Sequence, residues 1–213
     1  MNGVDSLQSQ TSTGSVPRGT RALLWAAVTV PFLYLGTVFI SALFYPGYSH
    51  ITQYASELGS TDATYPGIFN GGILLTGLVS LAIGPAFAHA IKAEGGNRVL
   101  GIILVVVMVL FGISMCMGAL FPMPDPRHGG FGLGMGIHLA PFLLAAALWK
   151  APNLRRLNIF LLLIGIAMLL LFIIMMGVGE LITQSNVGLF QRIFVLTIFP
   201  WIGIAAYVLC RRL

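Results

Sequence analysis

The sequence predicts an all-α membrane protein: a polytopic bundle of six transmembrane helices with both termini in the cytoplasm and a short amphipathic helix in the first extracytoplasmic loop. Of the 213 residues, 57% are hydrophobic and only 8% are charged, a balance outside the range of soluble globular domains. A membrane-spanning helix needs roughly 20 predominantly apolar residues. Six such stretches occur, at 22–43, 66–89, 99–120, 131–149, 157–179 and 187–209.

These stretches are expected to be helices and not barrel strands. A backbone in hydrocarbon must satisfy its own hydrogen bonds, which leaves helices and closed barrels. Barrel strands alternate polar and apolar residues, whereas NIFLLLIGIAMLLLFIIMMG (158–177) is apolar nearly throughout. The first stretch ends in FYPGYSH and not at a small-residue cleavage site, so we interpret it as a retained span.

Domain organisation and orientation follow from the polar residues between the stretches. Residues 1–20, rich in Ser, Thr, Gln and Gly, are predicted to be a disordered cytoplasmic tail, and residues 21–213 form the six-helix transmembrane domain. With the N-terminus inside, nine Lys and Arg residues fall in inner segments and two, Arg127 and Arg192, in outer ones. This bias predicts a multi-pass protein of the plasma (cytoplasmic) membrane, with membrane lipids and not nucleic acid as partners.

The first outer loop contains HITQYASELG (50–59), in which apolar residues recur at helical spacing. Ser49 can cap the start of this helix and Gly59 can end it. We expect the helix to lie on the outer surface of the bundle with Glu57 on its polar face.

Small residues at helical spacing predict close contacts between spans. Two such pairs are Gly67 with Gly71 and Gly130 with Gly134.

Acidic and histidine side chains gather on the predicted outer side, although no topological rule places them there. The loop sequence ALFPMPDPRHGG brings Asp125 and His128 close together, and His138 follows about two turns into the fourth span. Asp and His are residue types that bind zinc or act as acid and base. A metal site would need a further ligand from elsewhere, such as Glu57 or His50, so metal and cofactors stay open. An ionisable group inside a span, such as His138, is expected to face the bundle interior or a wet cavity.

Arg192 opens the sixth span within GLFQRIF, at or just below the predicted outer surface. A guanidinium at that depth snorkels outward or pairs with a carboxylate. We expect pairing, with Glu57, Asp125 or Glu180 as partner. Such a pair is structural or binds an anionic head group through its fork of donors.

Three pieces of the sequence resemble the bacterial and archaeal family called domain of unknown function 998. They are YPGYSHITQYASELGSTDATYPGIFNGGILLTGL, GALFPMPDPRHGG, and GLFQRIF followed by Pro200 and Trp201. The outer-loop pattern is also distantly similar to the Frag, DRAM and Sfk group of six-span proteins. The resemblance implies a role for Ser56, Glu57, Leu58, Gly59, Asn70, Pro122, Asp125, His128 and Arg192. In one departure, the glycine-rich GGFGLGMGI separates His128 from His138, where family members often have the second histidine a few residues after the first.

Two functions remain open. The first is binding of a lipid head group or small solute in an extracytoplasmic polar pocket. The second is a membrane-embedded enzyme, a metal-dependent hydrolase or an acid-initiated isoprenoid-type cyclase, with Glu57, Asp125, His128 and His138 as catalytic candidates. The predicted binding residues are Glu57, Asn70, Asp125, His128, His138 and Arg192.

Overall fold

The computed structural model describes residues 17–213, and six of its helical segments are long and apolar enough to cross a membrane. This confirms the predicted spans. The helices are α1 (Arg18–Leu43), α2 (Pro66–Ala93), α3 (Arg98–Leu120), η2 (Gly130–Leu139) with α4 (Ala140–Ala147), α5 (Arg155–Met175), and α6 (Val187–Ile198) with α7 (Pro200–Cys210). A short 3₁₀ helix, η1 (Ala55–Gly59), lies between α1 and α2. Of the predicted tail, residues 1–16 lie outside the described residues and 18–20 belong to α1.

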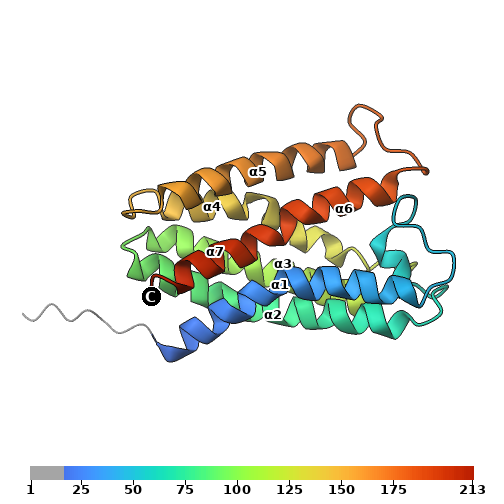
Figure 1. Cartoon of the computed structure of the whole chain (residues 1–213), viewed down its shortest axis with the longest axis horizontal. Helices are drawn as coiled ribbons and strands as arrows, with labels where there is room; N and C mark the ends of the chain where they lie inside the picture. The colour runs from blue at the N-terminus through green and yellow to red at the C-terminus, as the bar shows by residue number, and fades with distance from the viewer. Residues whose placement is uncertain (1–16) are drawn as a thin grey trace, which may run out of the picture.

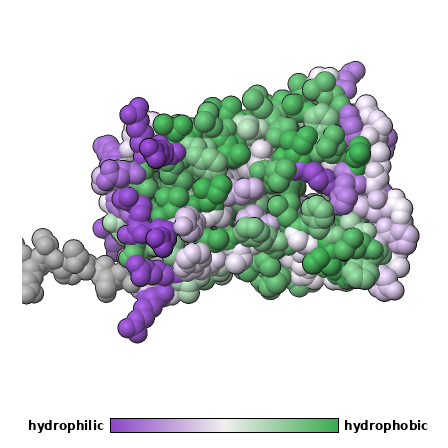
Figure 2. Space-filling view, viewed as in Figure 1, coloured by the Kyte–Doolittle hydropathy of each residue, from purple (hydrophilic) through white to green (hydrophobic). Residues whose placement is uncertain are grey.

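The helices run side by side along the long axis of the molecule, and α1 begins at the same end where the chain finishes (Figure 1). We call this the basic end, because nine of the eleven Lys and Arg residues fall in the segments there. The opposite end, where η1 and the loop after α5 lie, is the cap end (Figure 1). Between the two, hydrophobic residues form a broad belt over the visible face (Figure 2). A belt of this kind is the surface that a bilayer covers.

Helices α2 and α3 are held together by a close approach of their backbones. A Cβ added to Gly112 would lie 2.8 Å from the carbonyl oxygen of Gly77, and one added to Gly77 would lie 2.8 Å from the Sγ of Cys116. Helix α1 packs along α7, where Gly203 faces the ring of Pro31. Small residues therefore set the spacing of these helices, as is usual in membrane bundles.

Two of the six spans are broken, each beside a proline. In the last span, Phe199 separates α6 from α7, because Pro200 cannot donate to a carbonyl one turn earlier. In the fourth span, the 3₁₀ helix η2 changes to the α-helix α4 at Ala140, next to Pro141. The two segments together supply the 18 residues of this span, and η2 is itself kinked at Phe131 and Gly132, whose φ angles are 51° and 75°.

Glycines let η2 pack closely on α3. A Cβ on Gly130 would lie 2.6 Å from the hydroxyl of Ser114, and one on Gly134 would lie 3.0 Å from it. The predicted contact of this pair is confirmed. The other predicted contact is wrong, since a Cβ on Gly67 or Gly71 would meet no atom within 4 Å.

The first loop forms a shorter helix than predicted, and it is inserted into the bundle. Residues 49–53 form turns, and only Ala55–Gly59 are helical, as a 3₁₀ helix that ends at Gly59 as expected. Leu58 is 2% exposed and Ala55 is 3% exposed, so η1 is set into the end of the bundle and does not lie on its surface. We call residues 48–60 the cap.

Candidate functional site

The cap is bonded to the start of α6 by hydrogen bonds between segments far apart in the sequence. The backbone N–H of Leu189 donates to the carbonyl of Ile51 at 2.9 Å. The backbone N–H of Ala55 donates to Oε1 of Gln191 at 2.6 Å. At Gly188 the two backbones are so close that a side chain would collide with three carbonyl oxygens of residues 50–53. The cap and α6 therefore form one unit.

Arg192 also connects α6 to the cap through hydrogen bonds. Its Nη1 donates to the carbonyls of Gln53 at 2.8 Å and Gly188 at 3.2 Å and to Oε1 of Gln191 at 3.1 Å, and its Nη2 donates to the hydroxyl of Tyr48. Within residues 17–213 the two ion pairs are Arg127 with Asp125 and Arg212 with Glu94. The predicted pairing of Arg192 with a carboxylate is therefore wrong, because carbonyls brought in by the cap occupy the guanidinium instead.

The positive charge of Arg192 acts on its neighbours in the cap. Burial raises the pKa of Tyr48, an effect that Arg192 partly offsets. His50 stands edge to face against Tyr48, with ring centroids 5.2 Å apart. Burial and the nearby guanidinium both lower the pKa of His50, so the cap favours a neutral imidazole.

Glu57 and Asn70 hold the shape of the cap. Both carboxylate oxygens of Glu57 are engaged, Oε1 by the backbone N–H of Tyr54 at 2.7 Å and Oε2 by Nε2 of Gln53 at 2.9 Å. Asn70, on α2, donates from Nδ2 to the carbonyl of Gly59 at 2.9 Å, and its amide fills the space where a side chain on Gly59 would stand. Each of these predicted site residues thus stabilises backbone of the cap.

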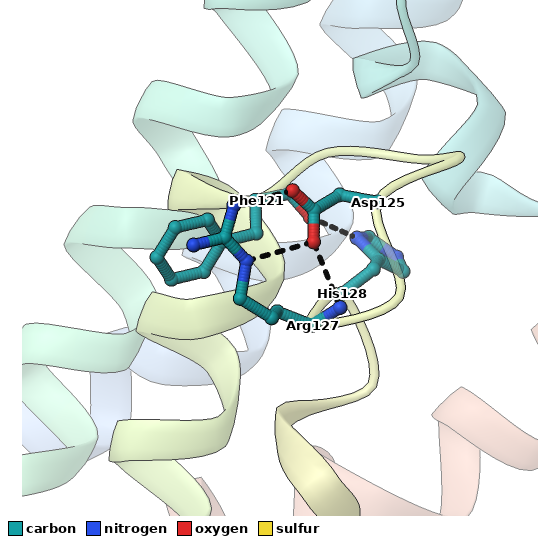
Figure 3. A network of polar contacts seen from close by, with 4 residues as sticks. All are labelled: Phe121, Asp125, Arg127 and His128. Atoms are coloured by element: carbon teal, nitrogen blue, oxygen red, sulfur yellow. Dashed lines mark hydrogen bonds and ion pairs between the residues drawn. The ribbon is translucent and has the colours of Figure 1, made fainter.

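Asp125 and Arg127 form a self-contained turn in the loop after α3 (Figure 3). Nε and Nη2 of Arg127 donate to the two carboxylate oxygens at 2.9 and 2.7 Å, and the guanidinium lies 3.8 Å from the centroid of the Phe121 ring. Hydrogen bonds from the side chain and backbone of Arg127 lower the pKa of Asp125 from 3.8 to about 2. The carboxylate is therefore neutralised within its own loop.

Both histidines of the predicted site have a defined tautomer, because each Nδ1 faces a backbone carbonyl and must donate to it. Nδ1 of His128 donates to the carbonyl of Phe121 at 3.1 Å (Figure 3). Nδ1 of His138 donates to the carbonyl of Met135 at 2.7 Å. In the neutral form the Nε2 atom of each ring is then a hydrogen-bond acceptor.

His138 is 8% exposed and faces the bundle interior, as predicted. Its ring packs against those of Phe172 and Phe194, at centroid distances of 4.4 and 5.4 Å. The buried Nε2 has no hydrogen-bond partner. His138 thus packs among aromatic rings, at a position separate from the loop that holds Asp125.

A cavity of about 410 Å³ lies beneath the cap, between α1, α2, α3 and α6. Much of its wall is aromatic, and its polar groups are Ser56 from the cap, Ser114 from α3, His128, and Gln191 from α6, with Tyr34 among the rings. None of the described residues that line it is Lys, Arg, Asp or Glu. The lining residues are Tyr34, Ser56, Phe69, Ile73, Phe111, Ser114, Met115, Gly118, His128, Gly129, Gln191, Phe194, Val195, Ile198 and Phe199.

The six predicted site residues do not meet in this cavity. Only His128 lines it, whereas Glu57, Asn70 and Arg192 hold the cap from outside, and Asp125 and His138 lie at their own positions. The polar lining residues Ser56, Ser114 and Gln191 were not among the six. Of these, Ser56 was implied by the family resemblance, and Gln191 had a signal in the sequence, the Gln-Arg pair that opens the last span. Serines are too common in membrane helices to single out Ser114.

No group of three or more His, Cys, Asp or Glu side chains in the described part of the chain is arranged to hold a metal ion. The metal-dependent hydrolase therefore has no ligand set among residues 17–213.

Residues 18–208 match the family described as "Protein of unknown function (DUF998)". The match takes in all the described helices except the last residues of α7, and it confirms the resemblance to that family. No curated protein and no solved structure matches the chain. The distant similarity to the Frag, DRAM and Sfk group stays a prediction.

Proposed function

The chain belongs to the DUF998 family, whose description assigns no activity, and we propose that it binds a neutral, membrane-soluble small molecule or lipid in the cavity beneath the cap. The observation that carries this proposal is the lining itself, which combines aromatic rings with a few uncharged polar groups. Ligand sites are commonly of this kind, with an apolar wall and a small number of polar groups that fix orientation.

Among the described residues that line the cavity none carries a fixed charge, and this argues for a neutral ligand. A charged group in a buried site needs an opposite charge or many hydrogen bonds. Arg192, the cation at the cap's contact with α6, already donates to carbonyls of Gln53 and Gly188. An anionic head group would have to displace those bonds, so this site favours an uncharged hydroxyl, carbonyl or ring.

Polar side chains in the cavity are suited to orient such a molecule. His128 offers Nε2 as an acceptor because its Nδ1 is committed to Phe121. Ser114 contributes a hydroxyl that can donate or accept. A ligand carrying one hydroxyl could be held by both, with its hydrocarbon part against rings such as Phe111 and Phe194.

The enzyme alternative has less support. A cyclase needs a carboxylic acid in the cavity, but Glu57 is bonded through both oxygens to the cap and Asp125 is paired with Arg127. His128 is the only one of the four catalytic candidates that lines the cavity. A single histidine can orient a ligand without doing chemistry on it.

We further propose that the basic end faces the cytoplasm of a plasma membrane, on the ground of its Lys and Arg excess. Asp62 at the cap end and Lys92 at the basic end are exposed, so Asp62→Cys and Lys92→Cys can be labelled in intact cells with a membrane-impermeant thiol reagent. The parent chain, with Cys116 and Cys210, gives the background. Asp62→Cys should label and Lys92→Cys should not; the reverse pattern would overturn the orientation.

The binding proposal is tested by filling the cavity. Ile73 lines it and is 6% exposed, so Ile73→Phe should occupy part of its volume. Ile103→Phe makes the same change on the exposed, lipid-facing side of α3 and serves as the matched control. Each protein is purified in mild detergent, and compounds extracted from it are quantified by mass spectrometry against the lipids of the source membrane.

We expect one neutral compound to be enriched with the parent chain and with Ile103→Phe and to be lost from Ile73→Phe. Ser114→Ala, which removes only a hydroxyl, should weaken its retention roughly 3- to 10-fold, the effect of one hydrogen bond. The proposal fails if no neutral compound is enriched above the membrane background, or if a folded Ile73→Phe retains it fully.

A further inference from the structure

A second cavity, of about 810 Å³, lies at the basic end, far from the cap. We propose that it is a binding site for an anionic phospholipid, with the phosphate at Lys150 and the start of an acyl chain between α4 and α5. This site shares no residue with the cavity beneath the cap, and the proposal does not depend on the function proposed there.

The lining of this cavity changes from polar to apolar in the way that a phospholipid does. One side consists of the loop Gly95–Asn97, between α2 and α3, together with Lys150. The other consists of Phe142 and Ala146 of α4 and Leu162 of α5. Trp149 also lines the cavity; it follows the apolar Ala146 in the sequence, directly precedes Lys150, and is 64% exposed. Tryptophan favours the boundary between head groups and hydrocarbon, which places the change of polarity at that level.

The charge at this end complements a phosphate. Lys150 is exposed, and Arg98, Arg155 and Arg156 are exposed in the neighbouring helix starts. Among residues 17–213, the one acidic side chain at this end is Glu94. It is bonded through both oxygens to Arg212, at 2.9 and 2.8 Å, so it does not repel an anion at Lys150. Clusters of Lys and Arg at a membrane surface attract anionic lipids.

The polar wall of the cavity is fixed in place. Gly96 lies so close to α4 that a side chain there would come within 2.6 Å of the carbonyl of Ala147, and the N–H of Asn97 donates to that carbonyl at 2.9 Å. Arg212 also donates to the carbonyl of Pro152 at 3.1 Å, which links the C-terminal segment to the loop after α4. The loop Gly95–Asn97 is thus bonded to α4 through Ala147, and the residue before it, Glu94, is paired with Arg212 of the C-terminal segment.

The apolar wall is fixed as well. The ring of Phe142 occupies the space above Gly165 on α5, where an added Cβ would lie 2.7 Å from the ring. The recess lies between the last residues of α4, which ends at Ala147, and Leu162 of α5. A recess with a fixed apolar side and a cation at its mouth suits one lipid chain below one phosphate.

Trp149 provides a direct readout. The full chain is reconstituted in phosphatidylcholine vesicles that contain, at equal mole fraction, either phosphatidylglycerol or phosphatidylcholine with brominated acyl chains, which quench nearby tryptophan fluorescence. The signal of Trp149 is the difference between the chain and its Trp149→Phe variant. We expect brominated phosphatidylglycerol to quench Trp149 several-fold more than brominated phosphatidylcholine does.

Matched variants separate this site from general attraction to a basic surface. Lys150→Gln should abolish the preference for phosphatidylglycerol, and Lys150→Arg should keep it. Lys92→Gln removes the same charge from the same end, outside the cavity, and should leave the preference intact. Equal quenching by the two brominated lipids would overturn the proposal. An equal loss of the phosphatidylglycerol preference in Lys92→Gln and Lys150→Gln would also overturn it, because that result indicates diffuse electrostatic attraction. A loss of the preference in Lys150→Arg would overturn it as well.

Discussion

The side-chain carbonyl of Gln191 accepts a hydrogen bond from the backbone N–H of Ala55, 136 residues away in the sequence. This bond joins the first turn of the 3₁₀ helix in the cap to the last membrane span. Gln191 also accepts from Arg192 and lines the cavity below. One amide thus connects the cap, the cation that fastens it, and the candidate ligand site.

Replacing Gln191 with Ala should loosen the cap. The N–H of Ala55 would lose its partner, and an unsatisfied buried N–H costs about 1–3 kcal/mol. We expect amide hydrogen exchange in residues 48–60 to accelerate roughly 5- to 100-fold, measured by mass spectrometry of peptides from the detergent-solubilised protein. The same change at Gln184, which is exposed in the loop before α6, is the control and should leave that exchange unchanged. Unaltered exchange in Gln191→Ala would show that the bond does not hold the cap.

Arg192→Lys should also loosen the cap, although it keeps the charge. A guanidinium can donate in several directions at once, whereas one ammonium cannot reach the carbonyls of Gln53 and Gly188 and the hydroxyl of Tyr48 together. We expect faster exchange in residues 48–60. The amount of co-purifying anionic lipid should not change in Arg192→Lys or Arg192→Gln. A loss of that lipid in Arg192→Gln would instead indicate a head-group site at this guanidinium.

Gly188→Ala should destabilise the protein by about 1–3 kcal/mol, the usual effect of overpacking. Its methyl group would collide with carbonyl oxygens of the cap that no rotamer change can move. Gly71→Ala, in α2, adds the same methyl group where no atom lies within 4 Å. Thermal unfolding in detergent should therefore show a lowered midpoint for Gly188→Ala and little change for Gly71→Ala. Equal midpoints for the two variants would contradict the close approach of α6 to the cap.

The pKa of Asp125 should be measurably low. Since Arg127 lowers it from 3.8 to about 2, the ionised form is favoured in the folded protein, and the ion pair's contribution is present above the ordinary Asp range. That contribution is lost as the pH falls through about 2. At about pH 3 the carboxyl should still be mostly ionised by ¹³C NMR of labelled Asp, and mostly protonated in Arg127→Gln. Identical titration in both proteins would mean that the pair does not form.

The six spans could be predicted because hydrophobic length is a local property of the sequence. The breaks within them lie beside Pro141 and Pro200, and a proline disturbs a helix wherever it stands. The 3₁₀ geometry of η2, in contrast, depends on how closely its glycines approach Ser114 of α3. That approach is a tertiary contact, and the sequence of η2 alone does not contain it.

The predicted site was wrong in its arrangement for a specific physical reason. Charge complementarity suggested that Arg192 meets a carboxylate, but two of its acceptors are main-chain carbonyls, which every residue carries, and the others are the uncharged side chains of Gln191 and Tyr48. The carboxylates in turn find local donors, Glu57 at Tyr54 and Asp125 at Arg127. Backbone partners have no side-chain signature, so reasoning from side chains overestimated the pairing of charges.

The fourth span differs from the others in where its regular turns begin. Within η2, Phe131 and Gly132 have φ of 51° and 75°, so the chain bends there and is not one continuous helix. His128 and Gly129, which line the cavity, stand directly before its first residue. The imidazole of His128 is held by the carbonyl of Phe121, at the end of α3. The two histidines of this segment are therefore positioned independently, His128 by the third span and His138 by the fourth, with a bend between them.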